Sequence, residues 1–190
     1  LGSNLGNYNR EILAEWNDKC GLLGIDTISA GTTLSYVMEA TEKGIMQTSL
    51  KFGSPDGVSS MLDDIAYRKG IGNEIANGTK WLSEKYGGTD FAIHVKGMEL
   101  SAYDPRGSWG QGLSYAVANR GGCHLAAAVF GAEVTYDYLN PNSTKHKAFY
   151  TDYFENFYTS INLLHTCQFT AYAYMQEPFV VKYSPGFILR

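Results

Sequence analysis

Asp26 is the first residue whose type and position suggest chemistry. It stands directly before Thr27 and a run of residues with helical spacing. A carboxylate at the start of a helix lies where free backbone N–H groups and the positive end of the helix dipole collect. On these residues alone, an ordinary N-cap is the favoured interpretation. A fixed acceptor for the N–H groups of a ligand is the alternative.

His124 is the second such residue. It follows Gly121, Gly122 and Cys123, and small residues allow the backbone to approach a bulky group closely. An imidazole with an unperturbed pKa of about 6.5 exchanges protons near neutral pH, which is the chemistry of a general acid or base. An isolated histidine more often fills a core or lies on the surface, so both interpretations stay open. We expect Cys123 to be a small buried apolar residue.

The cysteines form an odd set spread widely over the chain: Cys20, Cys123 and Cys167. This spacing fits neither a disulfide framework nor a zinc site that takes all its ligands from this chain. Cys167 is therefore either a buried free thiol or a ligand of a metal centre whose other ligands lie elsewhere.

Composition excludes several classes of function. The net charge is −4, and the 15 lysines and arginines are scattered, which argues against a nucleic-acid surface. No stretch approaches the ~18 consecutive apolar residues of a membrane span, and the first residues do not resemble a secretory signal. We expect a cytoplasmic protein. The chain opens on Leu1 with a loop-like sequence, which indicates a fragment.

The spacing of apolar residues predicts that the elements that position these side chains are mostly helices. Apolar residues recur at helical spacing over 8–20 and 28–43, then from Val58 until Gly70 closes the run, and again over 72–86. A glycine-rich loop is predicted over 104–112, followed by helical segments over 113–129 and 149–164. In the last segment an aromatic stripe is interpreted as core packing rather than as a stacking platform.

Four segments together resemble one known family. Residues 17–29 are similar to the first of two pterin-binding signatures, Asp-x-x-Gly-Leu-Asp/Cys, of the aldehyde ferredoxin oxidoreductase family. Residues 103–107 and 119–125 are similar to two further family segments, and 162–169 to the second signature. In the first signature Gly21 replaces the aspartate. Of the second signature only the cysteine is retained, since Asn162, His165 and Thr166 stand in place of aspartate, glycine and leucine.

The resemblance implies a mainly α fold. It would correspond to helical domains 2 and 3 of the family without the N-terminal β-rich domain. It implies a first helical domain over 1–105, which carries the first pterin motif, and a second over 106–190, which carries the active-site histidine and the cluster cysteine. His124 would be catalytic and Cys167 the metal ligand, while the cofactor-binding residues would be Gly24, Ile25, Asp26, Asn162, Thr166 and Cys167.

The implied cofactors are a tungsten or molybdenum ion held by two pterins, and a [4Fe–4S] cluster. Three more cluster cysteines and an active-site glutamate are expected upstream of Leu1. The implied reaction oxidises an aldehyde to a carboxylic acid and passes electrons to ferredoxin or an electron-transfer subunit, in a homo-oligomer or larger complex. A relative with the same cofactor and another substrate, such as the tungsten subunit of a benzoyl-CoA reductase, and a helical scaffold without cofactor are the alternatives.

Overall fold

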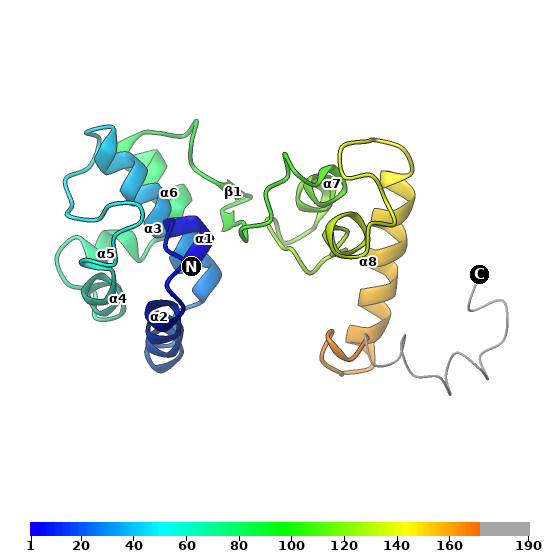
Figure 1. Cartoon of the computed structure of the whole chain (residues 1–190), viewed down its shortest axis with the longest axis horizontal. Helices are drawn as coiled ribbons and strands as arrows, with labels where there is room; N and C mark the ends of the chain where they lie inside the picture. The colour runs from blue at the N-terminus through cyan, green and yellow to red at the C-terminus, as the bar shows by residue number, and fades with distance from the viewer. Residues whose placement is uncertain (172–190) are drawn as a thin grey trace, which may run out of the picture.

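The computed structural model describes residues 1–171 and is built mainly from α-helices (Figure 1), which confirms the predicted fold class. The last 19 residues of the predicted second domain, 172–190, lie outside the described part. The elements in chain order are α1 (Gly2–Leu5), α2 (Arg10–Leu23), α3 (Thr27–Glu42), α4 (Val58–Ala66), α5 (Gly72–Ile75), α6 (Gly78–Tyr86), β1 (His94–Val95), β2 (Met98–Glu99), α7 (Trp109–Val117), a π-helical turn η1 (Gly131–Thr135) and α8 (Lys147–Leu163).

The helices form two groups, with the hairpin of β1 and β2 between them (Figure 1). In the first group α3 is the centre: Leu34, Val37 and Met38 are fully buried, and the helix contacts α1, α5, α6 and β2. Helix α2 packs on α4. One apolar cluster joins these elements, from Leu5 to Leu82. A second, smaller cluster joins Ala128 to α8. The domain boundary at 105/106 stays a prediction.

Helix α2 ends three residues later than predicted. Gly21 was expected to stop it, but the stop is Gly24, which adopts the left-handed conformation at φ 69°. A left-handed C-cap favours glycine because other residues pay a steric cost there. The turn that follows places Asp26 at the start of α3.

Two other predicted helices are wrong in part. The segment 72–86 is two short helices, α5 and α6, because Gly78, the first residue of α6, takes φ 84° and interrupts the helical backbone. The segment 113–129 is helical only to Val117, and α7 begins inside the predicted loop at Trp109. Beyond it, Gly121 and Ala128 have positive φ, so this stretch forms an irregular loop that carries His124.

The hairpin connects the two groups. β1 and β2 pair antiparallel, with His94 opposite Glu99, and both turn residues, Lys96 and Gly97, have positive φ. The second group rests on it: the backbone N–H of Gly122 donates to the carbonyl of Val95 at 3.2 Å. The Lys96 ammonium donates to the carbonyl of Ala118 at 2.9 Å.

Glycine is required at this contact. A Cβ on Gly121 would lie 2.3 Å from the Val95 carbonyl oxygen, and one on Gly122 would lie 2.6 Å from that of Met98. Backbone is the obstacle in both cases, so a side chain could enter only if the hairpin moved. The close approach sets the position of the residues that follow, Cys123 and His124.

In the second group α7 packs on α8. The predicted aromatic stripe of α8 is confirmed as packing, with Ile161 buried and Phe154 and Phe157 half-buried against the cluster. Within the described part of the chain, none of the helices is both long and apolar enough to cross a membrane.

Candidate active site

His124 is half-buried in the loop after Gly122. Burial lowers the pKa of its imidazole, and the positive charge of Arg120 acts in the same direction, while the negative charge of Asp26 raises the pKa. The imidazole is therefore held in its neutral form around pH 7, in which one ring nitrogen accepts a proton. Asp26 is thus near enough to His124 to influence its charge, although the two residues are about 100 positions apart in sequence.

Aromatic rings surround the histidine. The Tyr103 ring lies 5.7 Å from the His124 ring and is stacked at 4.0 Å on Phe130. A small hollow of about 50 Å³ opens beside these rings. Its described lining is Tyr103, His124, Leu125, Ala128, Phe130, Tyr158, Gln168 and Phe169.

A larger hollow of about 640 Å³ adjoins the small one, because Leu125, Gln168 and Phe169 line both. Two of the predicted site residues, Asn162 and Cys167, line this larger hollow. The polar side chains around them are Asn119, Arg120, Glu155, Asn156, Thr159 and Gln168. A hydrogen bond of 2.7 Å from the Gln168 amide to the Leu125 carbonyl fixes the boundary between the two hollows.

The first predicted motif forms the turn between α2 and α3. Asp26 is exposed, and its carboxylate accepts from the backbone N–H of Ser29 at 2.7 Å. The N-cap interpretation is therefore confirmed for Asp26. Its other carboxylate oxygen makes no hydrogen bond with the described residues, so a contact with a ligand is compatible with the cap. Gly24 is exposed with open space beside it, and Ile25 packs on the edge of the core.

The second predicted motif ends α8. Asn162 is exposed one residue before the end of the helix, and the Thr166 hydroxyl donates to the carbonyl of Ile161 at 3.3 Å. Cys167 is exposed and has a free thiol, whereas Cys20 and Cys123 are buried. The prediction for Cys123 is thus confirmed, and Cys167 is the one cysteine of the three that a ligand outside the chain can reach.

The exposed polar groups of Asp26, Asn162 and Cys167 fit the cofactors that the sequence predicts. The carboxylate of Asp26 and the amide of Asn162 are exposed acceptors for ring N–H groups, and the larger hollow has the volume typical of a cofactor site. A reachable thiol at its edge suits a cluster ligand. Among the described residues no group of three histidine, cysteine, aspartate or glutamate side chains gathers, so a metal centre needs further ligands from outside them.

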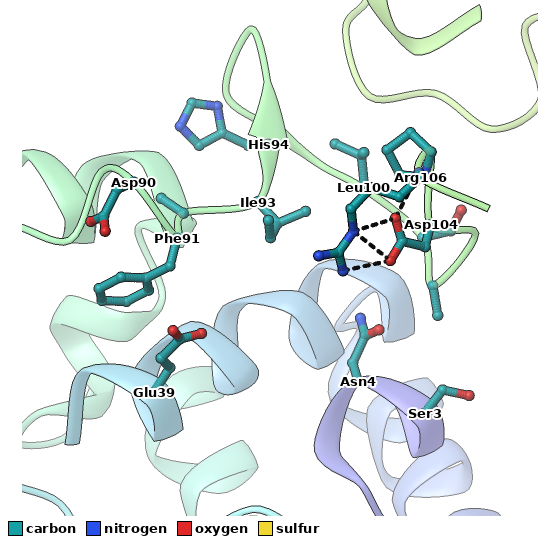
Figure 2. Close-up of a pocket in the computed structure, with 14 residues that line it drawn as sticks. Ser3, Asn4, Glu39, Asp90, Phe91, Ile93, His94, Leu100, Asp104 and Arg106 are labelled. Carbon is teal, nitrogen blue, oxygen red and sulfur yellow. Dashed lines mark hydrogen bonds and ion pairs between the residues drawn. The ribbon is translucent and has the colours of Figure 1, made fainter. Parts of the chain in front are cut away.

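A third hollow, of about 720 Å³, is lined by a different set of residues (Figure 2). Three segments surround it: α1, α3 and residues 90–106. Arg106 points back onto Asp104 at 2.6 Å, and its hydrogen bonds hold the pKa of that carboxyl below the usual value. Two residues of the family-like segment 103–107, Asp104 and Arg106, therefore form an ion pair at this hollow. None of the predicted cofactor or catalytic residues lines this hollow.

The hydrogen-bond network around Glu99 was not predicted from the sequence. Its carboxylate is buried and accepts from the backbone N–H of Thr79 at 2.9 Å. The hydroxyls of Ser29 and Thr33 donate to it at 3.2 and 3.4 Å. Glu99 therefore ties the start of α3, which carries Asp26, to the start of α6. Its partners are 20 to 70 residues away, so no local pattern signals this network.

A second network was also missed. Glu133 of η1 and Lys147 of α8 form a buried ion pair. Glu133 also accepts from the hydroxyl of Ser108 and from the backbone N–H groups of Gly110 and Gln111, at the start of α7. This pair holds together the elements that flank the histidine loop.

The chain matches the protein family described as "Aldehyde ferredoxin oxidoreductase, domains 2 & 3" over residues 1–185. A tungsten-containing aldehyde ferredoxin oxidoreductase of Thermococcus kodakarensis is 40% identical over 141 residues, which cover 70% of this chain and 23% of that protein. One from Pyrococcus abyssi is 34% identical over 184 residues, covering 90% of this chain and 30% of that protein.

A more distant relative is the "Aliphatic sulfonate oxidoreductase, WOR-like subunit" of Pyrococcus furiosus, 29% identical over 146 residues, covering 70% of this chain and 23% of that protein. The chain thus spans less than a third of the length of these relatives. The family match covers nearly all of the chain and agrees with the helical fold. The chain belongs to the aldehyde ferredoxin oxidoreductase family and corresponds to its domains 2 and 3.

Proposed function

We propose that the full-length protein is an oxidoreductase that converts aldehydes to carboxylic acids. One water oxygen is added to the carbonyl carbon, and two electrons leave for ferredoxin or an electron-transfer subunit. When bound, a tungsten or molybdenum ion held by two pterins would supply the two-electron chemistry, and a [4Fe–4S] cluster would carry the electrons onward. The tungsten-containing relatives support this choice of metal. Action in the cytoplasm is part of the same proposal.

The observation that carries the proposal is the junction of the two hollows. The proton acceptor His124 lines one hollow, the exposed thiol of Cys167 lines the other, and three residues line both. This arrangement supports the proposal that His124 and Cys167, 43 positions apart in sequence, serve one site as catalytic base and cluster ligand.

Each predicted residue then has a task that its geometry allows. Asp26 and Asn162 accept hydrogen bonds from the two pterins, and Gly24 and Ile25 shape the turn that presents Asp26. The neutral imidazole of His124 accepts the proton released as water adds to the carbonyl carbon. Cys167 ligates the cluster, and the hydrogen bond of Thr166 to Ile161 holds the segment before it.

The test uses the full-length protein and two matched variants. His124→Asn should reduce kcat for an aldehyde with ferredoxin or a viologen as acceptor by ~10²–10⁴-fold, with tungsten content unchanged. His146→Asn is the control: His146 is exposed and has φ 64°, a conformation that asparagine tolerates. Its turnover per tungsten should equal that of wild type.

Two outcomes would overturn the proposal. Full turnover per tungsten in His124→Asn would remove the histidine from the reaction. A full-length protein that holds neither tungsten, molybdenum nor iron would support the scaffold alternative instead.

A second candidate keeps the cofactor and changes the substrate, as in a benzoyl-CoA reductase run in the reductive direction. The departures at Asn162 and His165 in the second signature favour it. Reduction of a thioester-activated aromatic acid, without aldehyde oxidation, would select this candidate.

A further inference from the structure

Glu99 of β2 contacts both parts of the candidate site. Its side chain is buried under the first turns of α3, where the hydroxyls of Ser29 and Thr33 donate to its carboxylate. Its backbone lies against the histidine loop, because a Cβ on Gly122 would be 3.3 Å from the Glu99 carbonyl oxygen. His124 follows Gly122 by two residues. One residue of the hairpin therefore holds the start of α3 and supports the loop that carries the histidine.

Ser29 connects Glu99 to Asp26. The Ser29 hydroxyl donates to Glu99 Oε2 at 3.2 Å, and the Ser29 backbone N–H donates to Asp26 Oδ2 at 2.7 Å. The two carboxylates thus hold one residue from two sides. Terminal turns of helices fray readily, and a residue fixed from both sides opposes that fraying. The Asp26 carboxylate is kept in one position as a result.

We propose that Glu99 is a positioning residue: acting through Ser29, it fixes the Asp26 carboxylate for its contact with a pterin and sets its place relative to the histidine loop. The inference rests on the proposed function, which gives Asp26 this contact. Glu99 is buried and is not among the described residues that line the three hollows. It therefore acts through its hydrogen bonds rather than by touching substrate or cofactor.

The remaining bonds between α3 and β2 show why Glu99 can serve as a fixed point. The backbone N–H of Thr79 donates to Glu99 Oε1 at 2.9 Å, and the Thr32 hydroxyl donates to the carbonyl of Leu100 at 2.7 Å. These bonds stay in place when the Ser29 hydroxyl is removed. Ser29→Ala therefore breaks only the bond that leads toward Asp26, and it keeps the backbone N–H that caps the helix.

The experiment measures how fast the tungsten-loaded, full-length protein releases its tungsten below its melting temperature. Ser29→Ala should release tungsten about 5-fold faster than wild type, the factor expected for one hydrogen bond of ordinary strength. Thr33→Val is the matched control. It removes the other hydroxyl that donates to Glu99, one turn further along α3 and away from Asp26. Both variants should melt at a lower temperature, but Thr33→Val should release tungsten at the wild-type rate.

Two more variants separate position from charge. Glu99→Gln should release tungsten at nearly the wild-type rate, because the amide can still bond both Ser29 and the backbone N–H of Thr79. In an Asp26→Asn background, adding Ser29→Ala should change the release rate by less than about 2-fold, since the residue through which Ser29 acts is already altered. Release as fast in Glu99→Gln as in Ser29→Ala would show that charge and not position matters, and would overturn the inference.

Amide hydrogen exchange of the turn between α2 and α3, measured on protein without cofactor, gives a readout independent of tungsten. This turn should exchange faster in Ser29→Ala than in Thr33→Val.

Failure of the two proposals can be told apart. If the full-length protein holds no tungsten or molybdenum, or oxidises no aldehyde when loaded, the proposed function fails. If it holds the metal and oxidises aldehydes, but Ser29→Ala and Thr33→Val release tungsten and exchange amides at equal rates, Glu99 serves the stability of the fold alone and this inference is overturned.

Discussion

Replacing Lys147 by Met should loosen the whole second helix group. The Lys147 side chain is only 5% exposed, and its ammonium is shared between the Glu133 carboxylate and the Asn140 carbonyl. Methionine keeps the apolar stem of the lysine but removes the charge, so the substitution tests the ion pair more than the packing. It leaves the Glu133 carboxylate buried without its cation.

The expected magnitude follows from what remains around Glu133. Removal of one partner from a buried ion pair typically costs 3–5 kcal/mol, because the other charge is left without compensation. Ser108 and the backbone N–H groups of Gly110 and Gln111 still donate to Glu133, so the loss should fall at the low end, about 3 kcal/mol. A loss of this size raises the equilibrium constant for local opening of α7 and α8 by about 100-fold.

Amide hydrogen exchange of the full-length protein, measured peptide by peptide, reports this opening directly. Peptides of α7 and α8 should lose protection, and peptides of α2 to α4 in the other group serve as an internal reference. Lys145→Met is the matched control, since Lys145 is exposed two positions earlier. Equal protection of α7 and α8 in the two variants would refute the assignment.

A double variant separates charge from lost contacts. Adding Glu133→Gln to Lys147→Met removes the orphaned negative charge and keeps an acceptor for Ser108 and Gly110. Part of the lost protection should return. If the double variant were instead less protected than Lys147→Met, burial of an uncompensated charge would not be the cause of the loss.

Three further predictions concern the site. Cys167→Ser should lower the iron and sulfide content of the full-length protein, while Cys123→Ser should not; an intact cluster spectrum in Cys167→Ser would contradict the ligand role. Asp26→Asn keeps the helix cap but removes the charge that raises the pKa of His124, so the acid limb of the kcat/KM profile should move to lower pH; an unchanged limb would count against the coupling. Glu99→Leu leaves the Ser29 and Thr33 hydroxyls and the backbone N–H of Thr79 without their acceptor, and should destabilise the first helix group by about 3 kcal/mol in thermal unfolding. Glu99→Gln should recover most of the loss, and equal melting of the two variants would contradict this.

Long amphipathic helices were predictable from the sequence. The runs that became α2, α3, α4 and α8 each present apolar residues at helical spacing over several turns, and tertiary packing reinforced that pattern. Helix α1 was missed because four residues are too few to show a period. The positive φ of Ala128 could not be predicted from the sequence, because alanine has no intrinsic preference for that conformation.

The site was predictable only as separate residues. Local motifs singled out Asp26, His124 and Cys167, and the family resemblance assigned their roles. Their mutual placement depends on contacts between distant segments. The aromatic walls beside the histidine illustrate this, since Tyr103 and Phe130 stack across 27 positions of sequence. A contact between two residues so far apart produces no periodic pattern in the sequence, so it becomes visible only in the folded structure.

The glycine contact at the hairpin has a consequence for chimeric proteins. A boundary drawn at 105/106 separates β1 and β2 from the two glycines that lie against their backbone. An exchange of the histidine-bearing unit between family members at that point would join a hairpin from one parent to a glycine pair from the other. A junction before His94 keeps both sides of the contact from one parent, so we expect recombinants to tolerate that crossover better.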